Sequence, residues 1–162
     1  MVSSLNLSTK RMQHNLKIFF ALSFALICGC SPKTTDSQVE QLTVTRVIDG
    51  DTIVISGGEK VRLIGIDTPE KGQCGFDEAK QALEDLLSNG RAILYTGTIS
   101  DTDKYDRLLR YIEVEGTDVG LTLILDGLAI ARYDSRDGYG PHDRESQYIA
   151  ADENSAPALI CD

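Results

Sequence analysis

Carboxylates and an arginine stand close together near the middle of the sequence, and these side chains could do chemistry. The stretch DGDT carries Asp51, and VRLIGIDTPE carries Arg62, Asp67 and Glu70. Carboxylate oxygens are hard ligands of the kind that suits Ca²⁺ or Mg²⁺. The planar fork of a guanidinium can bind two oxygens of one phosphate. We therefore consider a metal ion and a phosphate as the ligands of this segment.

A β-hairpin would bring the two aspartates together. Alternating apolar and polar residues predict three antiparallel strands joined by tight turns, over residues 41–48, 52–56 and 59–66. If the second and third strands pair about Gly57-Gly58, their distant ends place Asp51 and Asp67 side by side. A simpler interpretation stays open, because acids beside turns commonly cap or solvate them. Arg62 could likewise pair with an acid on the sheet.

The remaining pattern predicts an α+β domain that is mainly β. Apolar residues at helical spacing predict a helix over 76–90, with Gly90 as its C-cap. Further elements are two strands (91–99 and 107–116), a helix (119–127), a short extended segment (128–133) and a terminal helix (144–154). This order suits a small closed barrel. After residue 30 the only histidine is His142, which leaves little for a histidine-based metal site or triad.

Four motifs, taken in order, resemble one family. They are DGDT, RLIGIDTPE, DKYDRLLRYI and GLAIARY. From about Leu42 to Asp152 the chain is similar to the thermonucleases, the staphylococcal (micrococcal) nuclease homologues. The resemblance implies a five-stranded oligonucleotide/oligosaccharide-binding barrel (OB fold) with three helices, which agrees with the order of elements predicted above.

The resemblance implies a metal site and a residue that handles water. Asp51 and Asp67 match carboxylates that bind Ca²⁺, and Thr68 matches a residue that binds it through its backbone carbonyl. Glu70 matches the acid that positions or deprotonates the attacking water. A carboxylate in that role typically contributes roughly 10²–10⁴ in rate.

The resemblance also implies a substrate-binding surface. Arg62 and Arg107 match two arginines that hold the scissile phosphate, and a catalytic role is expected for them as for Glu70. Lys104, Tyr105 and Tyr133 match residues that contact further phosphates. The implied activity is Ca²⁺-dependent hydrolysis of phosphodiester bonds in DNA, with RNA as a second candidate. The alternative is a catalytically weak barrel that binds nucleic acid or a protein partner at the cell envelope.

Three positions depart from the family pattern. Cys74 lies in a segment after Glu70 that is shorter than in the best-known members. Asp106 stands where glycine is common, and Ser135 stands where a second substrate-contacting tyrosine is frequent. These departures bear on substrate affinity and on the choice between DNA and RNA.

The first 29 residues are predicted to be a signal peptide. Three basic residues precede an uncharged stretch, IFFALSFALICG, and the run ICGC then leads into Cys30. This resembles a bacterial lipobox, in which the cysteine becomes the lipidated first residue. An ordinary secretory signal or an uncleaved anchor is the alternative. We expect residues 30–40 to form a flexible tether, residues 41–162 to form the folded domain, and the protein to be a monomeric envelope lipoprotein facing the periplasm or exterior.

The part after residue 30 is acidic. It carries 13 Lys and Arg against 25 Asp and Glu, a formal charge of −12. Such a domain cannot gather nucleic acid by a general positive field, so a polyanion must be held locally by a metal and a few arginines.

Two cysteines after Cys30 form a candidate disulfide. In an oxidising compartment, Cys74 and Cys161 are expected to pair. Two unpaired thiols are the alternative. By the chain-entropy model, so long a loop would contribute roughly 4 kcal/mol if the bond is unstrained.

Overall fold

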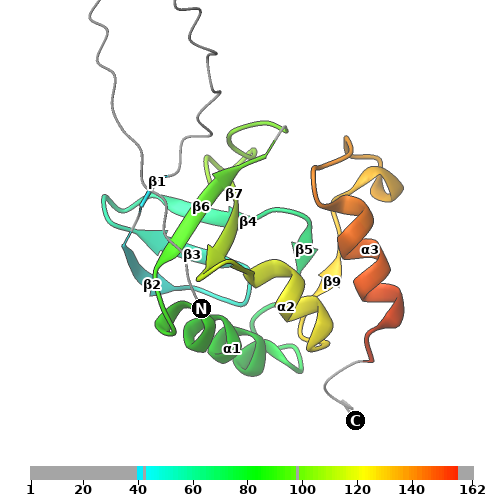
Figure 1. Cartoon of the computed structure of the whole chain (residues 1–162), viewed down its shortest axis with the longest axis horizontal. Helices are drawn as coiled ribbons and strands as arrows, with labels where there is room; N and C mark the ends of the chain where they lie inside the picture. Colours follow the sequence, from blue (N-terminus) through cyan, green and yellow to red (C-terminus); the bar gives the residue numbers. More distant parts are fainter. Residues whose placement is uncertain (1–39, 42, 98, 157–162) are drawn as a thin grey trace, which may run out of the picture. The chain divides into compact units, whose positions relative to one another are not determined.

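The protein is described by a computed structural model over residues 40–41, 43–97 and 99–156 (Figure 1). Its strands are β1 (Glu40–Gln41), β2 (Val44–Val47), β3 (Thr52–Ile55), β4 (Lys60–Leu63), β5 (Ile66–Asp67), β6 (Ala92–Thr96), β7 (Leu108–Val114), β8 (Thr117–Asp118) and β9 (Ile130–Ala131). Its helices are α1 (Phe76–Ser88), α2 (Val119–Leu125), α3 (Glu145–Asn154) and a short 3₁₀ helix, η1 (Ser135–Asp137). The predicted signal peptide and Cys30 lie outside the described residues, as does Cys161.

The main sheet curls into an OB-like half-barrel with helices packed against it. Its strand order is β1-β6-β7-β4-β3-β2, with β8 paired to β7. All neighbours are antiparallel except β4 and β7, which run parallel with Arg62 opposite Leu109. This one parallel pairing joins β2, β3 and β4 to the later strands. The strands and the three α-helices together confirm the predicted α+β, mainly β architecture.

The strand predicted over 59–66 is broken in two. β4 ends at Leu63, and β5 leaves the main sheet to pair with β9, with Asp67 opposite Ile130. The break occurs at Gly65, whose φ is 77°. A side chain there would be blocked, because an added Cβ would lie 2.5 Å from the buried ring of His142. The chain therefore turns beneath this ring and carries Asp67 away from the sheet.

The end of α1 also differs from the prediction. The helix ends at Ser88 with Asn89 as its C-cap, so the assignment of that cap to Gly90 is wrong. Gly90 serves a packing purpose instead, because a Cβ there would lie 2.5 Å from Glu115 Cγ. The loop between α1 and β6 thus passes directly against the loop that follows β7.

One apolar core holds these elements together. It is formed from the inner faces of the strands and from all three α-helices, with fully buried side chains that include Ile53, Val61, Leu83, Leu123 and Tyr148. Burying one such side chain contributes roughly 1.5–3 kcal/mol. α2 packs against β7 and both other α-helices, so the same core fixes the strand ends that carry the predicted site.

Candidate active site

Asp51 immediately precedes β3 and is held through both carboxylate oxygens. Its Oδ1 accepts from Thr52 Oγ1 (2.9 Å) and pairs with Arg62 Nε (3.1 Å). Its Oδ2 accepts from the N–H (3.1 Å) and the hydroxyl (3.0 Å) of Thr68. The side chain is buried, and burial raises the pKa of Asp51 to about 6 although the Arg62 charge opposes this. The charge of Arg62 thus offsets only part of the free-energy cost of burying the ionised carboxylate.

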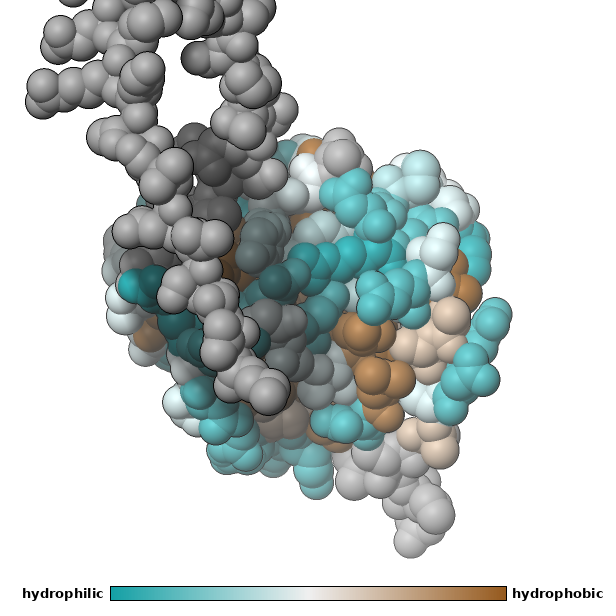
Figure 2. All heavy atoms as spheres, in the orientation of Figure 1, coloured by the Kyte–Doolittle hydropathy of each residue, from teal (hydrophilic) through white to brown (hydrophobic). Residues whose placement is uncertain are grey.

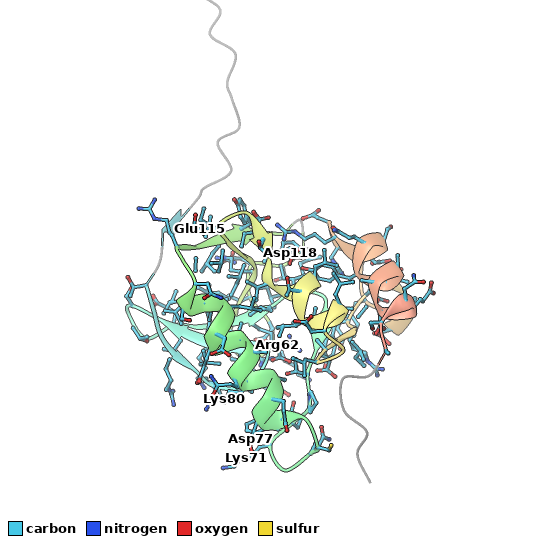
Figure 3. The ribbon with its side chains drawn as sticks, turned by 60° about the horizontal axis from the view of Figure 1, so that its bottom comes forward. Arg62, Lys71, Asp77, Lys80, Glu115 and Asp118 are labelled. Carbon is cyan, nitrogen blue, oxygen red and sulfur yellow. The ribbon has the colours of Figure 1, made fainter. Side chains whose placement is uncertain are left out.

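Arg62 lies on β4 and connects the two aspartates. Besides Asp51, its guanidinium contacts Asp67 Oδ1 (3.3 Å) and donates to the carbonyls of Leu63 (2.7 Å) and Ile66 (2.8 Å). The Arg62 side chain is buried, and Figure 3 labels it in the middle of the domain, whereas Lys71 and Lys80 are labelled near its lower edge. Arg62 thus pairs with acids, as the simpler interpretation predicted. It also lines a cavity, so it can contact a ligand there as well.

Asp51 and Asp67 form a pair of carboxylates that fits a divalent cation. Both are hard oxygen donors that share one guanidinium, and the raised pKa of Asp51 indicates that more positive charge would be favourable. In the described part of the chain, no three His, Cys, Asp or Glu side chains gather where they could hold a metal ion. The remaining ligands would therefore be backbone carbonyls, as predicted for Thr68, and water.

Glu70 lies on the exposed loop between β5 and α1, three residues after Asp67. The loop is closed by Gln73, whose side chain accepts from the Glu70 N–H (2.7 Å) and whose N–H donates to the Glu70 carbonyl (2.8 Å). The next residue, Cys74, is disulfide-bonded. Its predicted partner Cys161 lies outside the described residues, so that pairing stays a prediction, as does the role of Glu70.

Arg107 immediately precedes β7 and is held by Asp103. Its Nε and Nη2 both contact Asp103 Oδ2 (2.7 Å), and its Nη1 lies 3.5 Å from Thr52 Oγ1. Because Thr52 also donates to Asp51, a polar chain runs from Arg107 to the Asp51–Arg62 pair. The parallel pairing of β4 with β7 places these two arginines on the same side of the sheet.

One cavity of about 460 Å³ collects five of the predicted residues, namely Arg62, Lys104, Tyr105, Arg107 and Tyr133. The aromatic rings lie beside the cations, with Tyr105 within 5.5 Å of both Lys104 and Arg107, and Tyr133 at 5.4 Å from Arg62. The structure thus brings the predicted phosphate-binding residues together around a single space.

Asp51 and Asp67 are not among the residues that line the cavity, but two lining residues, Arg62 and Tyr133, contact them. Burial and the nearby Asp67 raise the pKa of Tyr133, so its hydroxyl stays protonated and donates to Asp67 Oδ1 (3.3 Å). Among the cavity residues that sequence reasoning missed are Asp103 and Tyr139. Asp103 was detectable, because it lies four residues before Arg107. Tyr139 belongs to no motif and had no such signal.

Figure 2 shows one face of the protein. Hydrophilic side chains cover most of the face seen in Figure 2, and apolar side chains gather in a smaller patch. Acids outnumber basic residues in the domain as a whole, whereas three cations, Arg62, Lys104 and Arg107, and one acid, Asp103, line the cavity. In a domain of negative net charge, this excess of cations favours binding of a polyanion at the cavity.

Comparison with known proteins agrees with this geometry. The family model described as "Staphylococcal nuclease homologue" matches residues 60–157. The chain is 36% identical over 135 residues to Thermonuclease of Staphylococcus intermedius, covering 76% of this chain and 77% of that protein.

Two relatives from Bacillus subtilis are longer. The chain is 35% identical over 138 residues to Endonuclease YncB, covering 79% of this chain and 63% of that protein. It is 33% identical over 129 residues to SPbeta prophage-derived endonuclease YokF, covering 74% of this chain and 42% of that protein. The chain thus spans about two thirds and two fifths of these proteins. With the fold, the motifs and the matched family model, these likenesses show that the chain belongs to the family of staphylococcal nuclease homologues.

Proposed function

We propose that the protein is a Ca²⁺-dependent nuclease that hydrolyses phosphodiester bonds of DNA, with RNA as a second substrate. The observation that carries this proposal is the cavity lined by Arg62 and Arg107, which a polar chain connects to the paired carboxylates of Asp51 and Asp67. Relatives that carry the names endonuclease and thermonuclease support the same reaction class.

The two arginines provide for the charge that develops during the reaction. In-line displacement at phosphorus spreads negative charge over the equatorial oxygens and the leaving oxygen. Guanidinium groups that are already positioned beside this charge stabilise it without reorganising. Arg62 is fixed by the carbonyls of Leu63 and Ile66, and Arg107 is fixed by Asp103. Both can therefore bind phosphate oxygens with little further loss of conformational freedom.

Three residues would hold the cation: Asp51, Asp67 and the backbone carbonyl of Thr68. When bound, Ca²⁺ supplies Lewis-acid stabilisation of the charge on the phosphate oxygens. Glu70 would orient or deprotonate the attacking water. Its loop is held by two hydrogen bonds between Glu70 and Gln73, one to the N–H and one to the carbonyl of Glu70. The hydroxyl of Tyr133 holds Asp67 by a hydrogen bond and keeps that carboxylate beside Arg62.

The test is cleavage of plasmid DNA and of RNA by the purified protein, with Ca²⁺ and with a chelator. Cleavage should require the metal, and Arg107→Ala and Glu70→Ala should each lose roughly 10²–10⁴ of the rate while keeping the melting temperature. Arg91→Ala, at an exposed arginine outside the cavity, is the matched control and should cleave normally. If clean protein cleaves neither substrate with any divalent ion, the alternative of a nucleic-acid- or protein-binding barrel is favoured instead.

We further propose that the protein is exported and anchored to the cell envelope through a lipid on Cys30. The basic residues, the short apolar run and ICGC support this proposal. Over the described residues, the structure contains no helix long and apolar enough to cross a bilayer. Replacing Cys30 by serine should move the protein from the membrane fraction to the soluble fraction. Equal membrane retention of both forms would contradict the lipid anchor.

A further inference from the structure

The position of Glu70 is set by its backbone rather than by its side chain. The residue is exposed on the loop between β5 and α1. Within the described residues, its carboxylate takes part in no hydrogen bond or ion pair, and only its N–H and its carbonyl are bonded. A group that handles the attacking water must nevertheless stay within hydrogen-bond reach of that water. The backbone of the loop must therefore provide this placement.

Gln73 holds that backbone at two points. Its side-chain Oε1 accepts from the Glu70 N–H (2.7 Å), and its own N–H donates to the Glu70 carbonyl (2.8 Å). The two bonds close residues 70–73 into one turn, in which Gly72 has a φ of 90°. Glycine adopts this left-handed conformation readily, whereas other residues are strained in it. The turn thus depends on two residues of this chain, Gln73 and Gly72.

The segment that contains the turn is anchored at both ends. Before it, the N–H and the hydroxyl of Thr68 bind Asp51 Oδ2, at 3.1 and 3.0 Å. After it, Cys74 is disulfide-bonded and α1 begins at Phe76. Between these anchors, the closed turn defines where Glu70 lies relative to the proposed cation site.

We propose that Gln73 is a positioning residue, which holds the backbone of Glu70 so that the carboxylate stays within reach of the attacking water. The inference rests on the proposed nuclease function, in which Glu70 handles this water. Gln73 is not among the residues that line the substrate cavity, so its loss should leave substrate binding unchanged. The expected signature is a lower kcat with little change in KM.

The first experiment measures kcat and KM for DNA cleavage by variants at Gln73. Gln73→Ala removes the acceptor of the Glu70 N–H and should lower kcat roughly 10- to 100-fold, because a misplacement of about 1 Å can cost a factor of about 10². Gln73→Glu keeps an acceptor oxygen and should recover most of the rate. Gln81→Ala is the matched control, because this exposed glutamine on α1 bonds only Asp85 (2.9 Å) through its side chain, and it should cleave normally.

A second pair of variants disturbs the turn through its backbone. Gly72→Ala places a side chain at a φ of 90° and should also lower kcat, although the space around the new Cβ is open. Gly58→Ala introduces the same strain at a φ of 92°, again in open space, in the turn between β3 and β4. It should affect stability without affecting kcat. Equal values of kcat in these two glycine variants would overturn the inference.

A double variant tests whether the effect passes through Glu70. If Gln73 acts by placing Glu70, then Gln73→Ala should cost nothing further once Glu70→Gln has been introduced. If Gln73→Ala lowers kcat by the same factor in both backgrounds, Gln73 acts independently of Glu70 and the positioning role is wrong.

Hydrogen exchange of the Glu70 amide separates this inference from the proposed activity. Measured in chelator and without substrate, the Glu70 N–H should exchange more slowly in wild type and Gln73→Glu than in Gln73→Ala. If wild type cleaves no nucleic acid but exchange follows this pattern, the nuclease proposal fails and the hold of Gln73 on Glu70 stands. If Gln73→Ala leaves the exchange unchanged, the inference is overturned whether or not the protein cleaves.

Discussion

Replacing Asp51 by asparagine should stabilise the metal-free protein while removing the proposed activity. The buried carboxylate has its pKa raised from an ordinary value of 3.8 to about 6, mainly by burial. Because one pH unit corresponds to about 1.4 kcal/mol, ionising Asp51 in the folded state costs about 3 kcal/mol at neutral pH. Asparagine has the shape of the protonated acid and does not carry this cost.

The substitution also removes one hydrogen bond. Asp51 Oδ2 accepts from the Thr68 N–H, and an amide group turned the same way would offer that N–H a donor in place of an acceptor. The lost bond costs about 1 kcal/mol. The net expectation is a gain of about 2 kcal/mol at pH 7, or about 4–8 °C in melting temperature for a protein of this size.

The sign of the effect depends on pH. Because the folded-state pKa of Asp51 lies above its unfolded-state value, the cost of ionisation is fully present above pH 6 and disappears below pH 3.8, where both states are protonated. The gain from Asp51→Asn should therefore be present at pH 7 and absent at pH 4. Ca²⁺ should raise the melting temperature of wild type but not of the variant.

The assay is thermal and urea unfolding in chelator at pH 4 and pH 7, followed by circular dichroism. Glu153→Gln, at an exposed position on α3, removes the same charge far from Asp51 and controls for the lowered net charge. If Asp51→Asn destabilises the protein at pH 7, or stabilises it equally at both pH values, the assignment of Asp51 as a poorly compensated buried carboxylate is wrong.

Three further perturbations test the packing around the site. Gly50→Ala should cost about 1–3 kcal/mol in urea unfolding, because the new Cβ would lie 2.8 Å from Ala79 Cβ, whereas Gly140→Ala has open space and should be neutral. Burial lowers the pKa of His142, so the unfolded state takes up a proton first and the free energy of unfolding should fall as pH drops below 6.5. His142→Gln should weaken this dependence of stability on pH, and an unchanged dependence would show that other groups cause it. Asp106 has a φ of 60°, so Asp106→Gly should stabilise the protein by about 0.5–1 kcal/mol, and a loss of stability would show that the aspartate side chain contributes more than its strain costs.

The arrangement of strands and helices was largely predictable because its signals are local. Alternation of apolar residues marks β3 and β4, and helical spacing marks α1, since each element must bury one face. The motifs that carry Asp51 and Arg62 were equally visible, because hairpin geometry makes short-range pairing predictable. Predictions failed at Gly65 and Gly90, where a distant side chain, of His142 and Glu115 respectively, occupies the space beside the backbone.

The sequence by itself determined which elements form and which residue types are present for chemistry, because periodicity and turn residues act over a few positions. Only the tertiary structure decided which of these side chains meet. Arg107 lies beside the Asp51–Arg62 pair because β7 pairs with β4, and Tyr139 joins the cavity through a turn anchored on a buried aspartate. Such contacts join residues far apart in the chain, and they depend on how the whole core packs, which no local pattern encodes.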